Sequence, residues 1–234
     1  MKYGAVTLAL NDEATIAGTI NCLRDHVDYH VVLISERSYF GNVLDNGKTE
    51  DICDKLGVEY IKGFWPLDHH QRTLGNDICR RNGCDWVLTF DSDELMDLEN
   101  IQILKEDIAA TEKKALVCKP ECYWKTTYYV LRPMPSYTPV IATRSDVEFP
   151  YIRNVNCSYD LTRALMHHVS WANPKDVYKK VTCYAHATDF DGKKWYEENY
   201  ANWEFPNDAV LPDRRYKVEN KKLPDGLLKC LNLT

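Results

Sequence analysis

Residues 86–94 read WVLTFDSDE, an apolar run followed by four polar residues of which three are acidic. The run 86–90 predicts a buried strand, because strands covered on both faces carry continuous apolar sequence. In an open parallel sheet, ligands bind beyond the carboxyl ends of the strands. We therefore expect Asp91 and Asp93 at the edge of a sheet where a site would lie, and their spacing lets both side chains face one ligand.

Two carboxylates this close repel each other unless a cation lies between them. A hard divalent ion bound by carboxylate oxygens removes that repulsion and can also bind phosphate oxygens. The alternative is an acidic turn that begins the next helix. Because the motif follows a buried strand, we favour binding of a metal and a phosphate, with Mn²⁺ or Mg²⁺ as the cofactor.

The sequence around this motif alternates between strand and helix patterns. We expect strands over 3–10, 30–35, 58–61, 86–90 and 115–118, and helices over 13–24, 48–56, 69–81 and 101–111. Asp68 is expected to cap the third of these helices and Gly83 to end it. Such alternation predicts an α/β fold with a mostly parallel central sheet and helices on both faces.

The pattern changes after residue 118. No helical period is visible over 119–165, which predicts strands and long loops, here interpreted as an antiparallel extension of the sheet. Asn173 and Pro174 form a typical helix start, and 195–203 is expected to be a short aromatic helix. The basic, leucine-containing tail 207–234 could rest on a membrane surface, but we favour docking on the domain.

The composition excludes several classes of protein. The 234 residues are 44% hydrophobic and 27% charged with a net charge of −6, which excludes wholesale disorder and disfavours nucleic acid as a partner. No apolar run approaches the ~20 residues of a membrane span, and residues 1–13 do not form a secretory signal, so membrane contact is at most peripheral. Nine scattered cysteines, an odd number, are expected to be reduced thiols in a cytoplasmic protein.

Three segments over residues 3–97 together resemble a GT-A nucleotide-diphospho-sugar glycosyltransferase of the family 2 type. They are VTLALNDEATIAGTINCL at 6–23, HVVLISERS at 30–38 and HHQRTLGNDICRRNGCDWVLTFDSDE at 69–94. The resemblance implies a Rossmann-like GT-A fold that transfers a sugar from a nucleotide diphosphate, with UDP-sugar as donor class and UDP-glucose as the default. The acceptor would be a glycan or a small molecule.

The resemblance also implies an organisation and a set of site residues. The chain would be a single domain over 1–234, with a nucleotide-binding half (1–118), an acceptor-binding half (119–206) and the tail. The implied roles are metal binding for Asp93, ribose or metal contact for Asp91, base and ribose contacts for Leu8 and Asn11, and base recognition for Glu36 and Arg72. The Ser35–Ser38 loop and Thr73 depart from the usual family sequence.

The second half offers candidates for the remaining roles. Among His167 and His168, at most one faces a site because neighbours on a strand point to opposite faces; we assign His168 to the metal and His186 to the pocket. Trp124 and Trp171 are candidate sugar contacts, since aromatic faces stack on sugar rings, although core filling is the commoner role. The candidate bases Asp146, Glu148 and Asp160 remain unresolved.

Two other functions fit parts of the sequence. A haloacid-dehalogenase-type phosphatase also places D-x-D after a buried strand, but Leu95 stands where that motif prefers Thr or Val. A non-catalytic sugar-binding protein on a transferase scaffold is the other alternative, and the intact acidic motif disfavours it.

Overall fold

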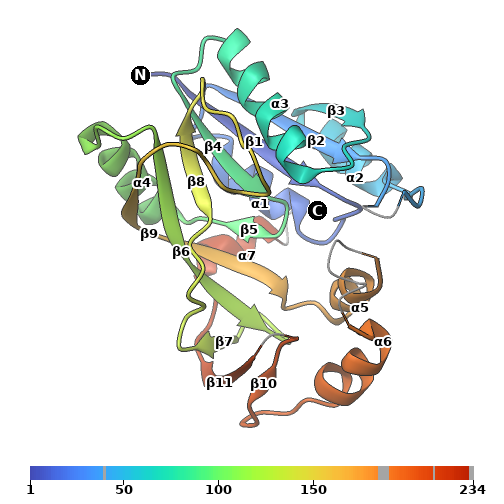
Figure 1. Ribbon diagram of the computed structural model, residues 1–234. Coiled ribbons are helices and arrows are strands. Elements are labelled where there is room, and N and C mark those ends of the chain that lie inside the picture. The colour runs from blue at the N-terminus through green and yellow to red at the C-terminus, as the bar shows by residue number, and fades with distance from the viewer. Residues whose placement is uncertain (39–40, 184–189, 213, 232–234) are drawn as a thin grey trace.

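The computed structural model describes residues 1–38, 41–183, 190–212 and 214–231 (Figure 1). Four parallel strands form its centre in the order β3-β2-β1-β4. They are β1 (Tyr3–Ala9), β2 (Tyr29–Ser35), β3 (Glu59–Gly63) and β4 (Trp86–Asp91). Leu8 of β1 pairs with Leu33 of β2 and with Asp91 of β4, so the carboxyl ends of these strands meet at one edge of the sheet.

Helices cover both faces of this parallel sheet. They are α1 (Ile16–Leu23), α2 (Gly47–Leu56) and α3 (Asp68–Arg81). Ala9 packs with residues of α1 and α2, whereas Val6 and Leu8 pack with residues of α3. Because side chains alternate along a strand, β1 serves both layers, and the predicted α/β fold with a mostly parallel centre is confirmed.

An antiparallel extension continues the sheet beyond β4. It contains β8 (Val140–Arg144), which pairs antiparallel with β4, and β6 (Ala115–Trp124), which pairs antiparallel with β8. The long β9 (Tyr159–Trp171) runs parallel to β6, an arrangement that the sequence did not indicate. The end of β9 pairs antiparallel with the short β5 (Glu94–Leu95), and α4 (Leu98–Ala110) packs against β9.

The lower part of the molecule in Figure 1 is a second, smaller lobe. Its elements are β7 (Tyr129–Arg132), α5 (Pro174–Cys183), α6 (Gly192–Trp195), the π-helix η1 (Tyr196–Ala201), β10 (Ala209–Val210) and β11 (Arg215–Asn220). β6 and β9 run from the large lobe toward this one. The boundary expected at residue 118 therefore falls inside β6, and the tail supplies two strands to the sheet.

Several local predictions from the sequence can be compared with the structure. The tail's last helix, α7 (Asp225–Leu231), packs against α1, with Leu231 close to Gly18, which confirms docking on the domain. Asp68 is not the cap of α3: Leu67 holds that position, and Asp68 instead accepts hydrogen bonds from Arg72 one turn later. The eight cysteines whose side chains are described carry free thiols. None of the helices in the described ranges is long and apolar enough to cross a membrane.

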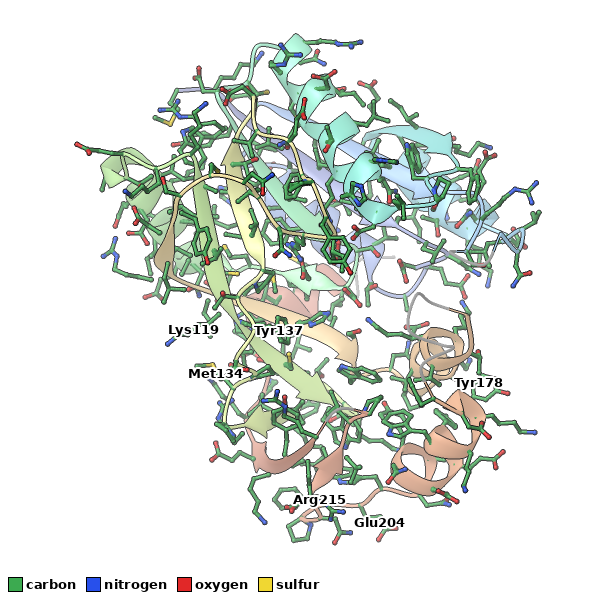
Figure 2. All side chains as sticks on the ribbon, in the orientation of Figure 1. Lys119, Met134, Tyr137, Tyr178, Glu204 and Arg215 are labelled. Atoms are coloured by element: carbon green, nitrogen blue, oxygen red, sulfur yellow. The ribbon has the colours of Figure 1, made fainter. Side chains whose placement is uncertain are left out.

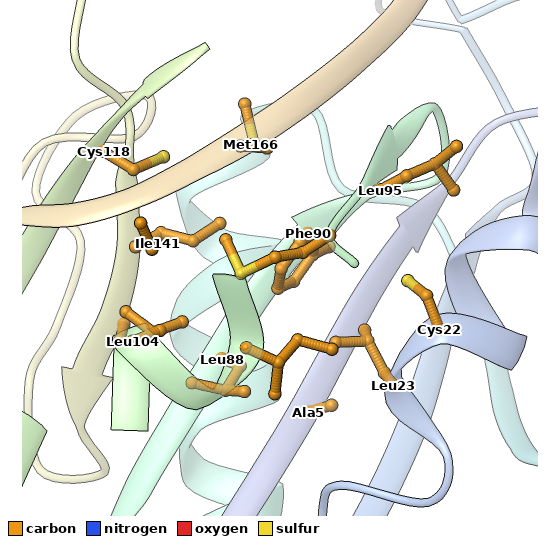
Figure 3. Close-up of a cluster of buried hydrophobic side chains, with 14 of the residues drawn as sticks. Ala5, Cys22, Leu23, Leu88, Phe90, Leu95, Leu104, Cys118, Ile141 and Met166 are labelled. Carbon is orange, nitrogen blue, oxygen red and sulfur yellow. The ribbon is translucent and has the colours of Figure 1, made fainter. Parts of the chain in front are cut away.

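The main hydrophobic core includes the residues on either side of the acidic motif (Figure 3). Phe90, the residue before Asp91, and Leu95, the residue after Glu94, are both fully buried in it. Neighbours in this core come from α1, α4, β8 and β9 and include Leu23, Leu104, Ile141 and Met166. The DSDE turn at 91–94 is therefore held at both ends by close-packed side chains.

Candidate functional site

The DSDE turn is also fixed by hydrogen bonds from neighbouring elements. The buried Thr19 hydroxyl of α1 donates to the carbonyl oxygens of Ser92 (2.8 Å) and Glu94 (3.0 Å). The Ser92 amide donates to the carbonyl oxygen of Leu8 at 2.9 Å. Leu8, expected near a base or ribose, thus lies one residue before the end of β1 and directly beside the acidic turn.

Pairing between β5 and β9 brings a histidine to this turn. Glu94 lies opposite His168 in the ladder, and the Val169 amide donates to the carbonyl oxygen of Asp93 at 2.9 Å. His168 Nε2 is consequently 3.4 Å from Asp93 Oδ1. His167 points to the opposite face, where Nδ1 lies 3.0 Å from the Tyr123 hydroxyl. Of the two adjacent histidines, the structure places His168 at the predicted site.

Further contacts hold His168 from its other side. The Tyr137 hydroxyl lies 3.1 Å from His168 Nδ1, and Tyr137 sits near the junction of the two lobes (Figure 2). Burial alone would lower the pKa of His168, but the charge of Asp93 and the hydrogen bond to it outweigh burial and raise that pKa to about 10. The pairing with Asp93 therefore favours the protonated form of His168.

Asp91 is held between two guanidinium groups. Arg72 of α3 donates to Oδ1 at 2.7 Å, and Arg153 donates to Oδ2 at 3.4 Å. Burial acts to raise the pKa of Asp91, but the charges of Arg72 and Arg153 outweigh it and hold the pKa below its ordinary value. Arg72, which was predicted to recognise the nucleotide base, is only 4% exposed and binds Asp91 instead.

Arg153 also neutralises the last residue of the motif. Its Nη1 lies 2.5 Å from Glu94 Oε1, and Nη2 donates to the carbonyl oxygen of Thr89 at 2.7 Å. The other oxygen of Glu94 accepts the amide of Asp91 at 2.9 Å. Sequence reasoning missed Arg153 because it lies in an irregular segment whose course depends on tertiary contacts.

Asp93 faces a lysine from the smaller lobe. Lys180 of α5 places its Nζ 3.3 Å from Asp93 Oδ2 and also donates to the hydroxyl of the buried Ser170. Burial acts to raise the pKa of Asp93, but Lys180 and His168 outweigh it and hold that pKa well below its usual range. These groups border a small polar pocket lined by Asp12, Thr15, Asp93, Ser170, Asp176 and Lys180.

Two carboxyl groups of this pocket have raised pKa values. Asp12 accepts hydrogen bonds from the Leu10 amide (2.9 Å) and the Ser92 hydroxyl, yet burial and the nearby charge of Asp93 raise its pKa to about 6. Burial likewise raises the pKa of Asp176 in the first turn of α5, and the charge of Asp93 adds to the rise. Asp12 is tied to the acidic turn by its hydrogen bond with Ser92. Asp176 is the pocket carboxylate outside the turn whose raised pKa suits it to accept a proton.

The loops after β1 and β2 are joined at the same edge. The Asn46 side chain accepts the Asn11 amide at 2.8 Å and donates to the carbonyl oxygen of Ser35 at 2.8 Å. Asn11 has φ of 54°, in the left-handed region that asparagine tolerates better than most residues. Glu36, which directly follows β2, is exposed. Asn11 and Glu36 therefore lie at the edge expected for a nucleotide, and Asn46 was not foreseen.

The candidate sugar contacts separate in the structure. Trp124 is fully buried among the aromatic side chains of the smaller lobe, so its ring has no face open to a ligand. Trp171 is partly exposed, and Lys180 Nζ lies 5.7 Å from its ring centre, which places Trp171 beside the pocket. His186 lies outside the described residues.

The three candidate bases are not brought to this site. Asp146 pairs with Lys114 at 2.7 Å and, with Glu148, lines a different pocket beside α3. Both residues follow Ser145, whose amide donates to the carbonyl oxygen of Asp85. Asp85 directly precedes β4, whereas Asp91 ends it, so this segment lies at the other end of the strand. Asp160 accepts a hydrogen bond from Thr111 and lies roughly 25 Å along β9 from His168.

The predicted divalent cation does not fit the side chains as they are arranged. Both oxygens of Asp91 face guanidinium groups, and those of Asp93 face His168 and Lys180. No group of three or more His, Cys, Asp or Glu side chains suited to hold a metal ion occurs in the part of the chain that the structure describes. Each carboxylate of the DSDE turn already has a cationic partner from the chain itself.

We compared the chain with known protein families, curated proteins and solved structures, and only the solved structures gave matches. No protein-family model matches the sequence, and a search of curated proteins found no significant match. Among solved structures, S. aureus TarS is 16% identical over 76% of this chain and 38% of its own, with a TM-score of 0.45. TarS 1–349 in complex with UDP-GlcNAc is 17% identical over 53% of this chain and 35% of its own, with a TM-score of 0.38.

A further similarity is to a putative nucleotide-diphospho-sugar transferase from Desulfovibrio desulfuricans G20. It is 10% identical over 76% of this chain and 86% of its own, with a TM-score of 0.45. The chain spans 38% and 63% of the first two TarS chains that it matches. With identities below 20% and TM-scores below 0.5, these are likenesses in fold, and any reaction has to be inferred from the residues of this chain.

Proposed function

We propose that this chain is a glycosyltransferase that moves a sugar from a nucleotide diphosphate to a hydroxyl group of a glycan or small molecule. The donor class is UDP-sugar, with UDP-glucose as the default. The observation that carries the proposal is the meeting of three loops at the carboxyl edge of the parallel strands, where Asp91 and Asp93 lie among Arg72, Arg153, Lys180 and His168. This edge is where open α/β sheets bind ligands.

Sugar transfer needs positive charge at the leaving group. As the bond between the anomeric carbon and the phosphate oxygen breaks, negative charge grows on the diphosphate and is stabilised by cations fixed in advance. The cations that the chain itself places at this edge, among them Lys180, could supply that charge. The nucleotide would lie over Leu8, Asn11 and Glu36, which share this edge.

The same transfer needs an acceptor for the hydroxyl proton. In a single displacement, the acceptor oxygen bonds to the anomeric carbon while a carboxylate takes its proton. We assign this role to Asp176, because it lines the pocket with Asp93 and Lys180 and its pKa is raised. Trp171, partly exposed beside Lys180, is the remaining candidate for stacking on a sugar.

The test is transfer itself. Purified protein is incubated with a panel of nucleotide sugars, with and without Mn²⁺, and release of nucleoside diphosphate and formation of product are measured. Asp93→Asn should lower turnover at least tenfold by removing the charge that holds Lys180 and His168 in place, and Asp176→Asn should lower turnover more than UDP affinity. Glu112→Gln, an exposed change after α4, is the matched control.

Other results would assign the chain elsewhere. Release of inorganic phosphate without sugar transfer, with a trapped aspartyl phosphate, would indicate the phosphatase. Affinity for free glucose without affinity for UDP would indicate a sugar-binding protein. Full activity in Asp93→Asn would remove the proposed site.

A further inference from the structure

We propose that Lys180 is a built-in counter-ion for the donor, so that its ammonium group neutralises the diphosphate without a divalent metal ion. This inference rests on the proposed function and adds to it the means by which the site binds a phosphate-bearing ligand.

The position of Lys180 follows from the helix that carries it. Pro174 begins α5, and the buried Val177 and Val181 anchor the helix in the smaller lobe. Asp176 and Lys180 are four residues apart and therefore lie on one face of the helix. That face lines the pocket that also contains Asp93. The helix thus presents a carboxylate and an ammonium group together to the acidic turn of the larger lobe.

The contacts of Lys180 are those of a cation placed between acidic groups. Nζ lies 3.3 Å from Asp93 Oδ2, donates to Ser170, and lies 5.7 Å from the centre of the Trp171 ring. The side chain is 27% exposed, so the ammonium is anchored and still in contact with the pocket. Burial acts to lower the pKa of Lys180, but the charges of Asp93 and Asp12 outweigh it, and the group stays protonated.

An ammonium group can do here what a divalent ion is expected to do. It is a compact charge with three N–H donors, so it can bond to a carboxylate and a phosphate oxygen at once. The repulsion between Asp91 and Asp93 is already removed, since Asp91 faces Arg72 and Arg153 while Asp93 faces Lys180 and His168. A divalent ion bound to Asp93 Oδ2 would have to displace the ammonium group of Lys180.

The experiment measures binding of UDP by isothermal titration calorimetry in EDTA and, separately, in Mn²⁺. We expect wild-type protein to bind UDP in EDTA with an affinity within about threefold of that in Mn²⁺. Lys180→Met should weaken binding in EDTA by about tenfold or more, the scale of one lost charge-assisted contact. Lys180→Arg, which keeps the charge, should retain most of the affinity.

Lys175→Met is the matched control, because Lys175 lies on the same helix with an exposed side chain. Thermal unfolding identifies any variant that fails to fold. Lys180→Gln serves in place of Lys180→Met in that case, since it keeps a donor toward Asp93 and Ser170 while removing the charge.

The outcomes separate this inference from the proposed function. Binding of UDP only in Mn²⁺, or undiminished binding in EDTA by the folded Lys180→Met or Lys180→Gln variant, would overturn the inference and leave the glycosyltransferase proposal standing. Absence of UDP binding in both buffers would overturn both.

Discussion

Arg153 binds two of the three carboxylates of the acidic turn. It contacts both Asp91 and Glu94 and donates to the carbonyl oxygens of Thr89 and Val140. Glu94 is 2% exposed, so loss of its partner leaves a buried carboxylate without a counter-charge.

We predict that Arg153→Met lowers the free energy of unfolding by about 3 to 5 kcal/mol, the usual cost of removing one member of a buried ion pair. Urea unfolding followed by circular dichroism measures the loss. The double variant Arg153→Met with Glu94→Gln should recover much of it, because the buried side chain at position 94 is then neutral. If the free energy of unfolding of Arg153→Met alone lies within about 1 kcal/mol of that of the wild type, the ion pair between Arg153 and Glu94 at 2.5 Å contributes little to stability.

The contribution of Asp12 to stability falls as the pH rises, whereas that of a salt-bridged acid falls as the pH decreases. Its pKa is raised in the folded protein to about 6, so folding favours the protonated form. The contribution of Asp12 to stability is therefore largest below its unfolded pKa of about 4 and is lost as the pH rises to about 6.

Asp12→Asn should remove this loss, since asparagine keeps an oxygen for the Leu10 amide and carries no charge. At pH 7 the variant should be more stable than wild type by on the order of 1 kcal/mol, and at pH 4 the two should be nearly equal. Unfolding at a series of pH values checks this. A constant difference across the range would mean that Asp12 does not titrate between the two states.

Residue patterns in the sequence located the acidic turn but not its counter-charges. Asp91 and Asp93 follow an apolar run, and the alternation of strand side chains separated His168 from His167. Arg153 and Lys180 carry no such signal, because each reaches the turn from a segment far along the chain, through pairing and helix docking that local pattern does not encode. The candidate bases failed to converge on the site for the same reason.

At the scale of elements, the approach of α3 to β1 determines where Arg72 can lie. Gly75 faces β1, and a Cβ at this position would lie 2.5 Å from Val6 Cγ1. No side chain fits at that distance, so glycine allows the helix to pack close enough for Arg72 to reach Asp91 at 2.7 Å.

We predict that Gly75→Ala destabilises the protein by about 1 to 3 kcal/mol, the range for overpacking a core, despite the higher helix propensity of alanine. It should also weaken UDP binding by shifting Arg72. Gly226→Ala is the control, because nothing lies within 4 Å of a Cβ there. Val6→Ala should destabilise the Gly75→Ala variant less than it destabilises the wild type, and equal losses in the two backgrounds would refute the steric explanation.

Elements were predictable wherever period and composition agreed. The βαβ units of the first 118 residues match the strands β1 to β4 and helices α1 to α3 closely. In the later segment, β9 is parallel to β6 although the sequence indicated only an antiparallel extension. That pairing joins residues about 45 positions apart, and its strand direction depends on the whole chain path.

At the scale of the whole molecule, the candidate site forms where the two lobes meet. The larger lobe contributes Asp12, Asp91 and Asp93 from the ends of parallel strands, and α5 of the smaller lobe contributes Asp176 and Lys180. Because β6 and β9 run through both lobes, the two halves of the site are held by one continuous sheet. Binding of a diphosphate between the lobes is the central claim.

The most direct test is a crystal structure of the protein with UDP in the presence of EDTA. We predict density for the diphosphate at the edge formed by Asp12 and Asp93, with a phosphate oxygen within hydrogen-bond distance of Lys180 Nζ and the uridine toward Asn11 and Glu36. UDP bound instead in the pocket beside Thr73, Arg80 and Glu148, or an edge at which Asp93 and Lys180 contact only solvent, would contradict the account.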